Sequence, residues 1–153
     1  MTKTSQVPKF VRIGNVLTTT LLRAGFKLAG PYMIRGNYPL YLITVRGRKS
    51  GQPRTVPLVI IRQNGKRYLS SPYGIVDWVR NLRAAGEAIL TRGRRSETVS
   101  ARELPPGEAA LVLREDFQGG NPFAHFFGVT AQSSLEDFER ATTIHPVFVL
   151  ETK

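Results

Sequence analysis

Residues 46–54, RGRKSGQPR, bring together side chains that suit the binding of an anion. Arg48 and Arg54 can each direct a planar guanidinium at phosphate or carboxylate oxygens, and Lys49 adds a point charge. The residues that follow, Thr55–Ile61, have the apolar and β-branched composition of a buried strand. The pattern therefore predicts an anion-binding loop that leads directly into the core.

The glycines and the serine of this loop support the same interpretation. Gly47 and Gly51 permit backbone turns that other residues avoid and let main-chain N–H groups approach a ligand, while Ser50 adds a hydroxyl donor. The loop is not a nucleotide-binding P-loop, because its glycines enclose too few residues and no Gly-Lys-Ser/Thr follows. A basic hairpin tip that binds nothing explains these residues about equally well.

Other catalytic arrangements have little support in the sequence. His125 and His145 are far apart, and neither has an acidic partner at a metal-ligand spacing, so we predict no metal site. The chain has no cysteine, which excludes disulfides and thiolate chemistry. If the protein is an enzyme, we expect a cofactor to carry the reaction.

The formal net charge of +11 favours partners that are polyanions: nucleic acid, anionic lipid, or a cofactor rich in phosphates and carboxylates. The same charge also has a simpler explanation, which is solubility. No apolar run reaches the roughly 18 residues of a membrane span, and the N-terminus does not resemble a secretory signal. We therefore expect a cytoplasmic protein.

The elements that position the loop read as one mainly β domain over residues 1–153, with its core at 38–150. Asn64-Gly65 and the basic turn Arg92–Arg95 join strands as hairpins, so we expect an antiparallel sheet rolled into a small barrel. The predicted strands are Tyr38–Val45, Thr55–Ile61, Arg67–Ser70, Ala88–Thr91, Thr98–Leu104 and His145–Leu150.

Short helices are predicted between the strands. One is capped by Asp77 and ends before Gly86, one runs from Pro106 to about Phe117, and one follows a capping box at Ser133 and Glu136. Phe10–Leu28, in the N-terminal segment 1–30, has the periodicity of an amphipathic helix. Packing on its own domain explains this helix best, and its bases also allow peripheral contact with an anionic membrane.

The segments GRKSGQPRTVPL, SSPYG and DWVRNL together resemble the deazaflavin-dependent nitroreductase family of actinobacteria, whose members bind coenzyme F-420. The resemblance extends from about Tyr38 to Leu150, and its most specific parts are the basic loop and the Trp-x-x-Asn-Leu helix. It implies an α+β, mainly β fold: a split β-barrel of the pyridoxamine-phosphate-oxidase-like, FMN-binding type, with short peripheral helices and an N-terminal amphipathic helix.

The resemblance also implies roles for individual residues. It places Arg48, Lys49, Ser50, Gly51 and Arg54 at the cofactor's phosphate and tail, Val56, Pro57 and Val59 at the face of the deazaflavin, Ser70, Ser71, Pro72, Tyr73 and Gly74 under the ring, and Trp78, Asn81 and Leu82 on the helix beside the pocket. Substrate choice does not transfer. The best-known nitroimidazole-activating member has a tyrosine where Val59 stands, and its substrate tyrosines are replaced by Phe123, Phe126 and Phe127.

The activity that the resemblance implies is hydride transfer from reduced coenzyme F-420 to a small electron-poor acceptor: a quinone, nitroaromatic or activated enone. No catalytic residue is assigned, and the proton donor can be Ser71, Tyr73 or water. We expect a monomer or weak homodimer that does not bind nucleic acid. Contact with the inner face of the membrane would be peripheral.

Three alternatives stay open at this stage. The same barrel can serve as a lipid or fatty-acid binding protein, although such a carrier has no use for a phosphate-binding loop. The cofactor can be FMN, which the fold also admits. Sequence-independent nucleic-acid binding through Arg92–Arg95 ranks last, because exposed aromatic residues do not alternate with the bases.

Overall fold

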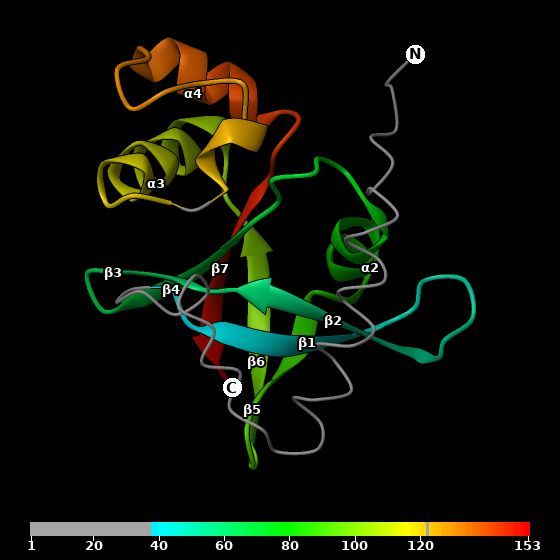
Figure 1. Ribbon diagram of the computed structural model, residues 1–153. Coiled ribbons are helices and arrows are strands. Elements are labelled where there is room, and N and C mark those ends of the chain that lie inside the picture. Colours follow the sequence, from blue (N-terminus) through cyan, green and yellow to red (C-terminus); the bar gives the residue numbers. More distant parts are fainter. Residues whose placement is uncertain (1–37, 122) are drawn as a thin grey trace.

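A computed structural model of the chain describes residues 38–121 and 123–153 (Figure 1). The strands are β1 (Leu40–Arg46), β2 (Pro53–Val59), β3 (Ile61–Gln63), β4 (Lys66–Ser70), β5 (Glu87–Arg92), β6 (Arg95–Glu103) and β7 (Val147–Thr152). The helices are α2 (Asp77–Ala85), α3 (Pro106–Gln118), α4 (Leu135–Thr142) and the 3-10 helix η1 (Ala124–Phe126). The amphipathic helix expected at Phe10–Leu28 lies outside the described residues. Within the described ranges, no helix is both long and apolar enough to cross a membrane.

All seven strands belong to one antiparallel sheet in the order β2-β1-β5-β6-β7-β4-β3. The two outermost strands, β2 and β3, are consecutive in the chain and are separated by Ile60 alone. One bent segment therefore pairs with β1 before Ile60 and with β4 after it, which brings the two edges of the sheet together. The barrel predicted from the sequence is confirmed, but the single strand expected at Thr55–Ile61 is wrong, because the chain bends at Ile60.

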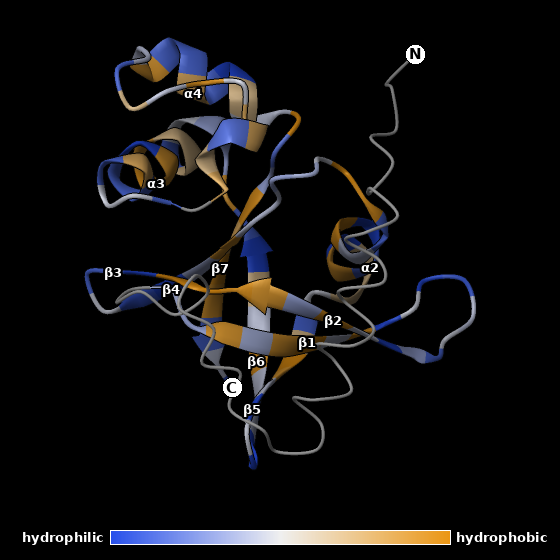
Figure 2. Ribbon diagram, viewed as in Figure 1, coloured by the Kyte–Doolittle hydropathy of each residue, from blue (hydrophilic) through white to orange (hydrophobic). Residues whose placement is uncertain are grey.

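Two apolar clusters lie on opposite faces of the sheet. The interior cluster contains Ile43, Leu69, Leu90, Val99 and Phe148 from the strands, and α2 adds Val79 and Leu82 to it. The second cluster lies between the sheet and the helices α3 and α4, with Leu113, Phe117 and Phe138 at its centre. Figure 2 shows β1, β2 and β7 as largely apolar ribbons, whereas the β1–β2 loop and the β5–β6 turn are hydrophilic.

The helix termini follow the local sequence closely, with two corrections. Asp77 lies in the first turn of α2 and does not cap it, because the N-cap position belongs to Val76. The carboxylate still faces the positive end of the helix dipole. The capping box of α4 is formed by Ser134 and Asp137, one residue later than predicted. Gly86 ends α2 as expected, with a φ of 69°.

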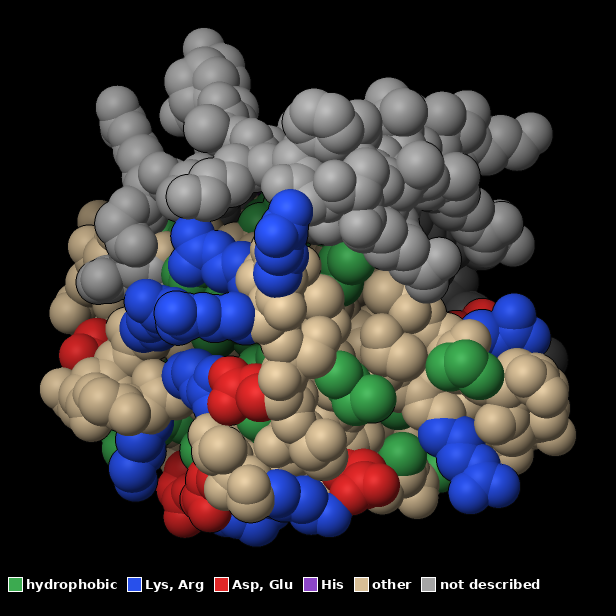
Figure 3. Space-filling model, turned by 90° about the horizontal axis from the view of Figure 1, so that it is seen from below, with side chains coloured by type: hydrophobic (Ala, Val, Ile, Leu, Met, Phe, Trp, Pro, Cys, Tyr) green, Lys and Arg blue, Asp and Glu red, His purple; other side chains and the backbone are tan. Residues whose placement is uncertain are grey.

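Polar side chains gather where the barrel ends at β3, β4 and the β5–β6 turn. The guanidinium of Arg67 pairs with the carboxylate of Glu97, and Thr152 Oγ1 bonds to both. Arg62 Nη2 donates to the hydroxyl of Tyr41 at 3.1 Å, and Arg92 lies over the same ring. Figure 3 shows this face from below, where lysine and arginine side chains outnumber acidic ones. The positive charge expected from the composition is therefore exposed here.

Candidate anion-binding site

The basic loop connects β1 to β2 and projects from the barrel beside α2 (Figure 1). Its turn is closed by two backbone hydrogen bonds: Gly47 N–H donates to Gln52 O at 2.8 Å, and Gly51 N–H donates to Gly47 O at 2.9 Å. Gly51 has a φ of 70°, which a residue with a side chain adopts only under strain. A Cβ at Gly47 would lie 3.0 Å from both Gln52 O and Ser50 Oγ. Both glycines are therefore required by the shape of the loop.

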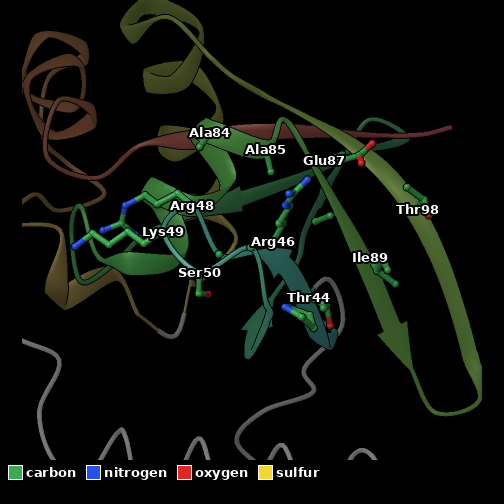
Figure 4. A pocket seen from close by; sticks show the side chains of 14 residues that line it. Thr44, Arg46, Arg48, Lys49, Ser50, Ala84, Ala85, Glu87, Ile89 and Thr98 are labelled. Carbon is green, nitrogen blue, oxygen red and sulfur yellow. The ribbon is translucent and has the colours of Figure 1, made fainter.

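A hollow of about 800 Å³ lies between this loop and the junction of α2 with β5 (Figure 4). The loop contributes Arg46, Lys49 and Ser50 to one side, together with Arg48 and Gly51. The opposite side is formed by Ala84, Ala85, Glu87, Ala88 and Ile89. Glu87 is the one carboxylate among these residues, and its charge is balanced by an ion pair with Lys153. The hollow is therefore basic on one side and largely uncharged on the other.

Arg48 holds the loop against α2. Its backbone N–H and its Nη1 both donate to Asn81 Oδ1, at 3.1 Å and 2.8 Å. Its Nη2 also lies 3.3 Å from Asp77 Oδ1. Asn81 is only 5% exposed, so its carbonyl oxygen is a fixed point on the helix. The basic loop and the Trp-x-x-Asn-Leu helix, which the sequence marked separately, are thus joined through one side chain.

The other cations of the loop have no such partner. Within the described residues, Arg46, Lys49 and Arg54 form no ion pair, and all three are exposed. The guanidinium of Arg46 lies against Gly51, since a Cβ there would be 3.7 Å from Arg46 Nη2. Arg46 was not among the expected site residues. Alternation along β1 was the available signal, because it places Arg46 on the same face as Thr44, which also lines the hollow.

The residues expected at the cofactor ring lie elsewhere than the hollow. Val56, Tyr73 and Trp78 are half-buried and pack against the interior cluster. Val59 packs against the second cluster, together with Phe123. Pro57 is half-buried on β2, and Leu82 is fully buried inside the interior cluster. The structure therefore gathers Arg48, Lys49, Ser50 and Gly51 around the hollow, with Asn81 joined to them through Arg48. Arg54 does not line the hollow, and the expected ring residues are divided between the two clusters.

Ser71 anchors the 70–74 loop to the start of β7. Its N–H donates to Pro146 O at 3.2 Å, and its carbonyl oxygen lies 2.8 Å from His145 Nδ1. A carbonyl can only accept, so His145 carries its proton on Nδ1. Burial lowers the pKa of His145, which favours the neutral ring. Ser71 is fully buried and its hydroxyl donates to Gly74 O, so of the two expected proton donors Tyr73 is the more accessible.

Aromatic side chains of the 123–127 segment lie beside this loop. The rings of Tyr73 and Phe126 meet edge to face, with centroids 4.8 Å apart. Phe127 lies 4.8 Å from the His145 ring and packs on Phe117. Burial raises the pKa of Tyr73, so its hydroxyl keeps its proton at neutral pH. The segment expected to contact the acceptor thus lies next to the better of the two proton-donor candidates.

Comparison with known proteins gives three findings. A family model described as F-420H(2)-dependent quinone reductase matches residues 18–125, which is most of the chain. None of the curated proteins matches. Among solved structures, an F-420-H(2)-dependent reductase (FDR-A) is 26% identical, covers 74% of this chain and 94% of its own, and superposes with a TM-score of 0.54. A structure described as a domain-swapped dimer is 24% identical, with coverages of 93% and 97% and a TM-score of 0.55, and shows a shared fold.

Proposed function

Since this chain belongs to the F-420H(2)-dependent quinone reductase family, it is a deazaflavin-dependent oxidoreductase, and we propose that its acceptor is a quinone or a similarly electron-poor small molecule. The match over residues 18–125 is the observation that carries this proposal. Nitroaromatics and activated enones belong to the same chemical class of hydride acceptors. Coenzyme F-420 is the cofactor, as the family description states.

The residues of the basic loop fit this cofactor, which has a ribityl phosphate and a tail of glutamates. The loop offers three cations that form no ion pair with any described residue, the hydroxyl of Ser50, and a glycine at position 47, where a Cβ would lie 3.0 Å from Gln52 O. Phosphate and carboxylate oxygens are the groups that such donors bind. FMN has one phosphate and no glutamates, so the number of cations favours the deazaflavin.

We propose that the expected site residues surround the cofactor at the positions that the resemblance implies. Arg48, Lys49, Ser50, Gly51 and Arg54 would form the loop at the phosphate and tail, and Val56, Pro57, Val59, Ser70, Ser71, Pro72, Tyr73, Gly74, Trp78, Asn81 and Leu82 would border the ring. The half-buried positions of Val56, Tyr73 and Trp78 around one cluster support this assignment. When bound, the reduced deazaflavin supplies a hydride from its C5 carbon.

The protein's own part in the reaction is orientation, exclusion of water and supply of a proton. Trp78 and Phe126 present apolar surface that would keep water from the ring face. Tyr73 holds a proton at neutral pH, and its ring meets the ring of Phe126 edge to face. We propose Tyr73 as the donor to the reduced acceptor, with water as the alternative.

A titration and a turnover assay test the function together. The purified protein is titrated into oxidised coenzyme F-420 and, separately, into FMN, with ligand fluorescence as the signal. The reduced deazaflavin is then mixed with a soluble quinone, and its reoxidation is followed by absorbance. We expect tighter binding of the deazaflavin and quinone-dependent reoxidation. Equal or tighter binding of FMN would contradict the cofactor assignment, and reoxidation no faster than without protein would contradict the activity.

Oligomeric state and location are separate proposals. We propose a weak homodimer, supported by the domain-swapped dimer among the similar structures. We also propose a cytoplasmic protein in peripheral contact with the inner membrane face, supported by the net charge of +11. Analytical ultracentrifugation tests the first, and co-sedimentation with anionic vesicles in low and high salt tests the second. A single monomeric species, or no vesicle binding in low salt, would contradict them.

A further inference from the structure

The cations of the basic loop are of two kinds, and the difference suggests a division of roles. We propose that Arg46 is the arginine that binds anionic oxygens in the hollow, and that Arg48 positions the loop by latching it to Asn81. This inference rests on the proposed function, because it takes the phosphate or the glutamate tail of the cofactor as the anion. It assigns a binding residue outside the expected set and gives Arg48 a different task.

The contacts of Arg48 are those of a structural latch. Two of its donors converge on the single oxygen Asn81 Oδ1, at 3.1 Å and 2.8 Å, and one of them is a backbone N–H. The far side of its guanidinium is occupied by Asp77, at 3.3 Å. A carboxylate beside the guanidinium offsets its charge, so a second anion gains less by approaching it. Arg48 therefore fixes where the loop lies rather than what it binds.

Arg46 has the opposite surroundings. It is the last residue of β1, opposite Pro53 in the strand pair, so its backbone is held by the sheet. Its guanidinium lies along Gly51, where the missing side chain leaves room for it, and no acidic residue of the described chain pairs with it. Figure 4 shows Arg46 directed toward Ala85 and Glu87 across the hollow, whereas Arg48 and Lys49 extend the other way.

The remaining groups of the hollow leave Arg46 available to a ligand. Glu87 is the acidic residue that faces it, and the ion pair with Lys153 offsets that charge. Ser50 Oγ already accepts from Gln52 N–H at 3.2 Å, so its own proton is left to donate. A planar guanidinium suits either a phosphate or a carboxylate. The shared chemistry is an oxyanion, and the experiment distinguishes its two sources.

The first experiment compares Arg46→Ala with Arg94→Ala, which removes the same charge from the exposed β5–β6 turn away from the hollow. Affinities are measured for three ligands: intact coenzyme F-420, the form that lacks the glutamates, and the deazaflavin with a bare ribityl chain. We expect Arg46→Ala to lower the affinity for intact F-420 roughly tenfold to a hundredfold, the loss expected when one charge-assisted hydrogen bond is removed. Arg94→Ala should weaken it less than threefold, the range of a remote exposed charge.

The pattern over the three ligands identifies the source of the oxyanion. A loss confined to intact F-420 places Arg46 at the tail, and a loss shared with the form without glutamates places it at the phosphate. Either result supports the inference. An equal loss for all three ligands, or a loss no greater than that of Arg94→Ala, would overturn it, because Arg46 would then act through the fold or not at all.

The second experiment tests the latch with a double-mutant cycle on Arg48 and Asn81. If Arg48 acts through Asn81, the latch can be lost only once. We then expect the same loss of affinity for intact F-420 in Arg48→Ala, in Asn81→Ala and in the double variant. Asn81→Asp keeps the accepting oxygen and should restore most of the affinity. Losses that add in the double variant, or no rescue by Asn81→Asp, would make Arg48 a direct ligand and refute the latch.

A third measurement separates this inference from the proposed function. Calorimetry with γ-linked triglutamate and with inorganic pyrophosphate tests the hollow without any deazaflavin ring. If the wild-type protein binds no deazaflavin, the proposed function fails. Weaker binding of either anion to Arg46→Ala than to Arg94→Ala would still support the role of Arg46, and equal binding of both anions to the two variants would refute it.

Discussion

The hydroxyl of Tyr38 donates a 3.0 Å hydrogen bond to the backbone carbonyl of Asp116, in the last turn of α3. Asp116 is only 2% exposed, and its Oδ1 has no hydrogen-bond partner among the residues that the structure describes. Its Oδ2 accepts from Asn121, whose own oxygen accepts from Phe123 N–H. Burial is the main cause that raises the pKa of Asp116 from 3.8 to about 6. The residue therefore carries an incompletely satisfied charge in the core at neutral pH.

Asp116→Asn should stabilise the protein at neutral pH. The folded-state pKa lies above the unfolded value, so the folded form holds its proton more tightly and stability falls as pH rises from about 4 to about 6. The full shift corresponds to about 3 kcal/mol, and since the amide must also be accommodated, we expect a gain of about 1–3 kcal/mol. Urea unfolding at pH 4 and pH 7.5 measures it.

Glu115→Gln is the control for this variant, because it changes an exposed carboxylate on the same turn. It should alter stability by less than about 0.5 kcal/mol at either pH. An Asp116→Asn protein that is no more stable than the wild type at pH 7.5 would contradict this prediction, because it would show that water reaches the Asp116 carboxylate and that its charge costs no stability.

Glu97→Gln should lower the free energy of unfolding by about 1 kcal/mol. The effect is modest because the carboxylate is partly exposed. The hydrogen bond from Arg67 is the first cause that lowers the pKa of Glu97. A depressed pKa contributes stability above the unfolded value of 4.5 that is lost as pH falls. The difference between wild type and variant should therefore shrink below pH 4.

The measurement is thermal unfolding from pH 3 to pH 7, with Glu87→Gln as the comparison. Glu87 pairs with Lys153, but both side chains are about half exposed, so a smaller effect is expected. Equal losses for the two variants would mean that the Arg67–Glu97 pair gains nothing from its partly buried position.

Gly51→Ala should both destabilise the fold and weaken the binding of the cofactor. The φ of 70° costs an alanine about 1 kcal/mol, and the new methyl group would contact the guanidinium of Arg46. Gly93→Ala is a matched control, since Gly93 has a φ of 62° with nothing within 4 Å of the added carbon. Both variants should lose similar stability in urea, and only Gly51→Ala should bind coenzyme F-420 more weakly. Equal affinities would place the anion away from Gly51.

Phe126→Ala should change the handling of the acceptor and leave cofactor affinity unchanged. The ring is 36% exposed and meets Tyr73 edge to face, so its removal opens the wall beside the proposed proton donor. We expect kcat/KM for a quinone to fall several-fold, with little loss of stability. Leu111→Ala, on the exposed face of α3, is the control and should keep wild-type kinetics. A drop in F-420 affinity with unchanged acceptor kinetics would contradict this assignment.

Local elements were predictable because short-range chemistry determines them. Asn64-Gly65 predicts a tight hairpin turn, and these residues have φ values of 50° and 74°. Gly86 and Pro106 likewise mark where α2 ends and α3 begins. The bend at Ile60 was not predictable. The apolar run along 56–61 continues through it, and the bend follows only from pairing with β1 before Ile60 and with β4 after it.

The site likewise combines features that the local sequence predicts with contacts that it does not predict. The basic loop motif identified Arg48 and the family resemblance identified Asn81, but the hydrogen bonds between them join positions 33 residues apart, and no local pattern predicts such a contact. Arg46 was overlooked because the Gly-Arg-Lys-Ser-Gly motif begins after it. The role proposed for it depends on the absence of an acidic partner among the described residues, which only the folded arrangement reveals.

The position of β7 between β4 and β6 has a consequence for how the chain folds. The β1–β2, β3–β4 and β5–β6 pairs are hairpins that form between neighbouring residues, whereas β7 must meet both β4 and β6, with Arg67 opposite Leu150. Pairing β7 with β4 closes the long stretch of chain between Arg67 and Leu150, and closing so long a loop costs more conformational entropy than closing a hairpin. The hairpins should therefore form first, and β7 should dock late in the folding reaction. Pulse-labelled hydrogen exchange would then show the amides of β7 protected after those of β1. Simultaneous protection would instead mean that the barrel assembles in one cooperative step, in which the pairings of β7 form together with the hairpins.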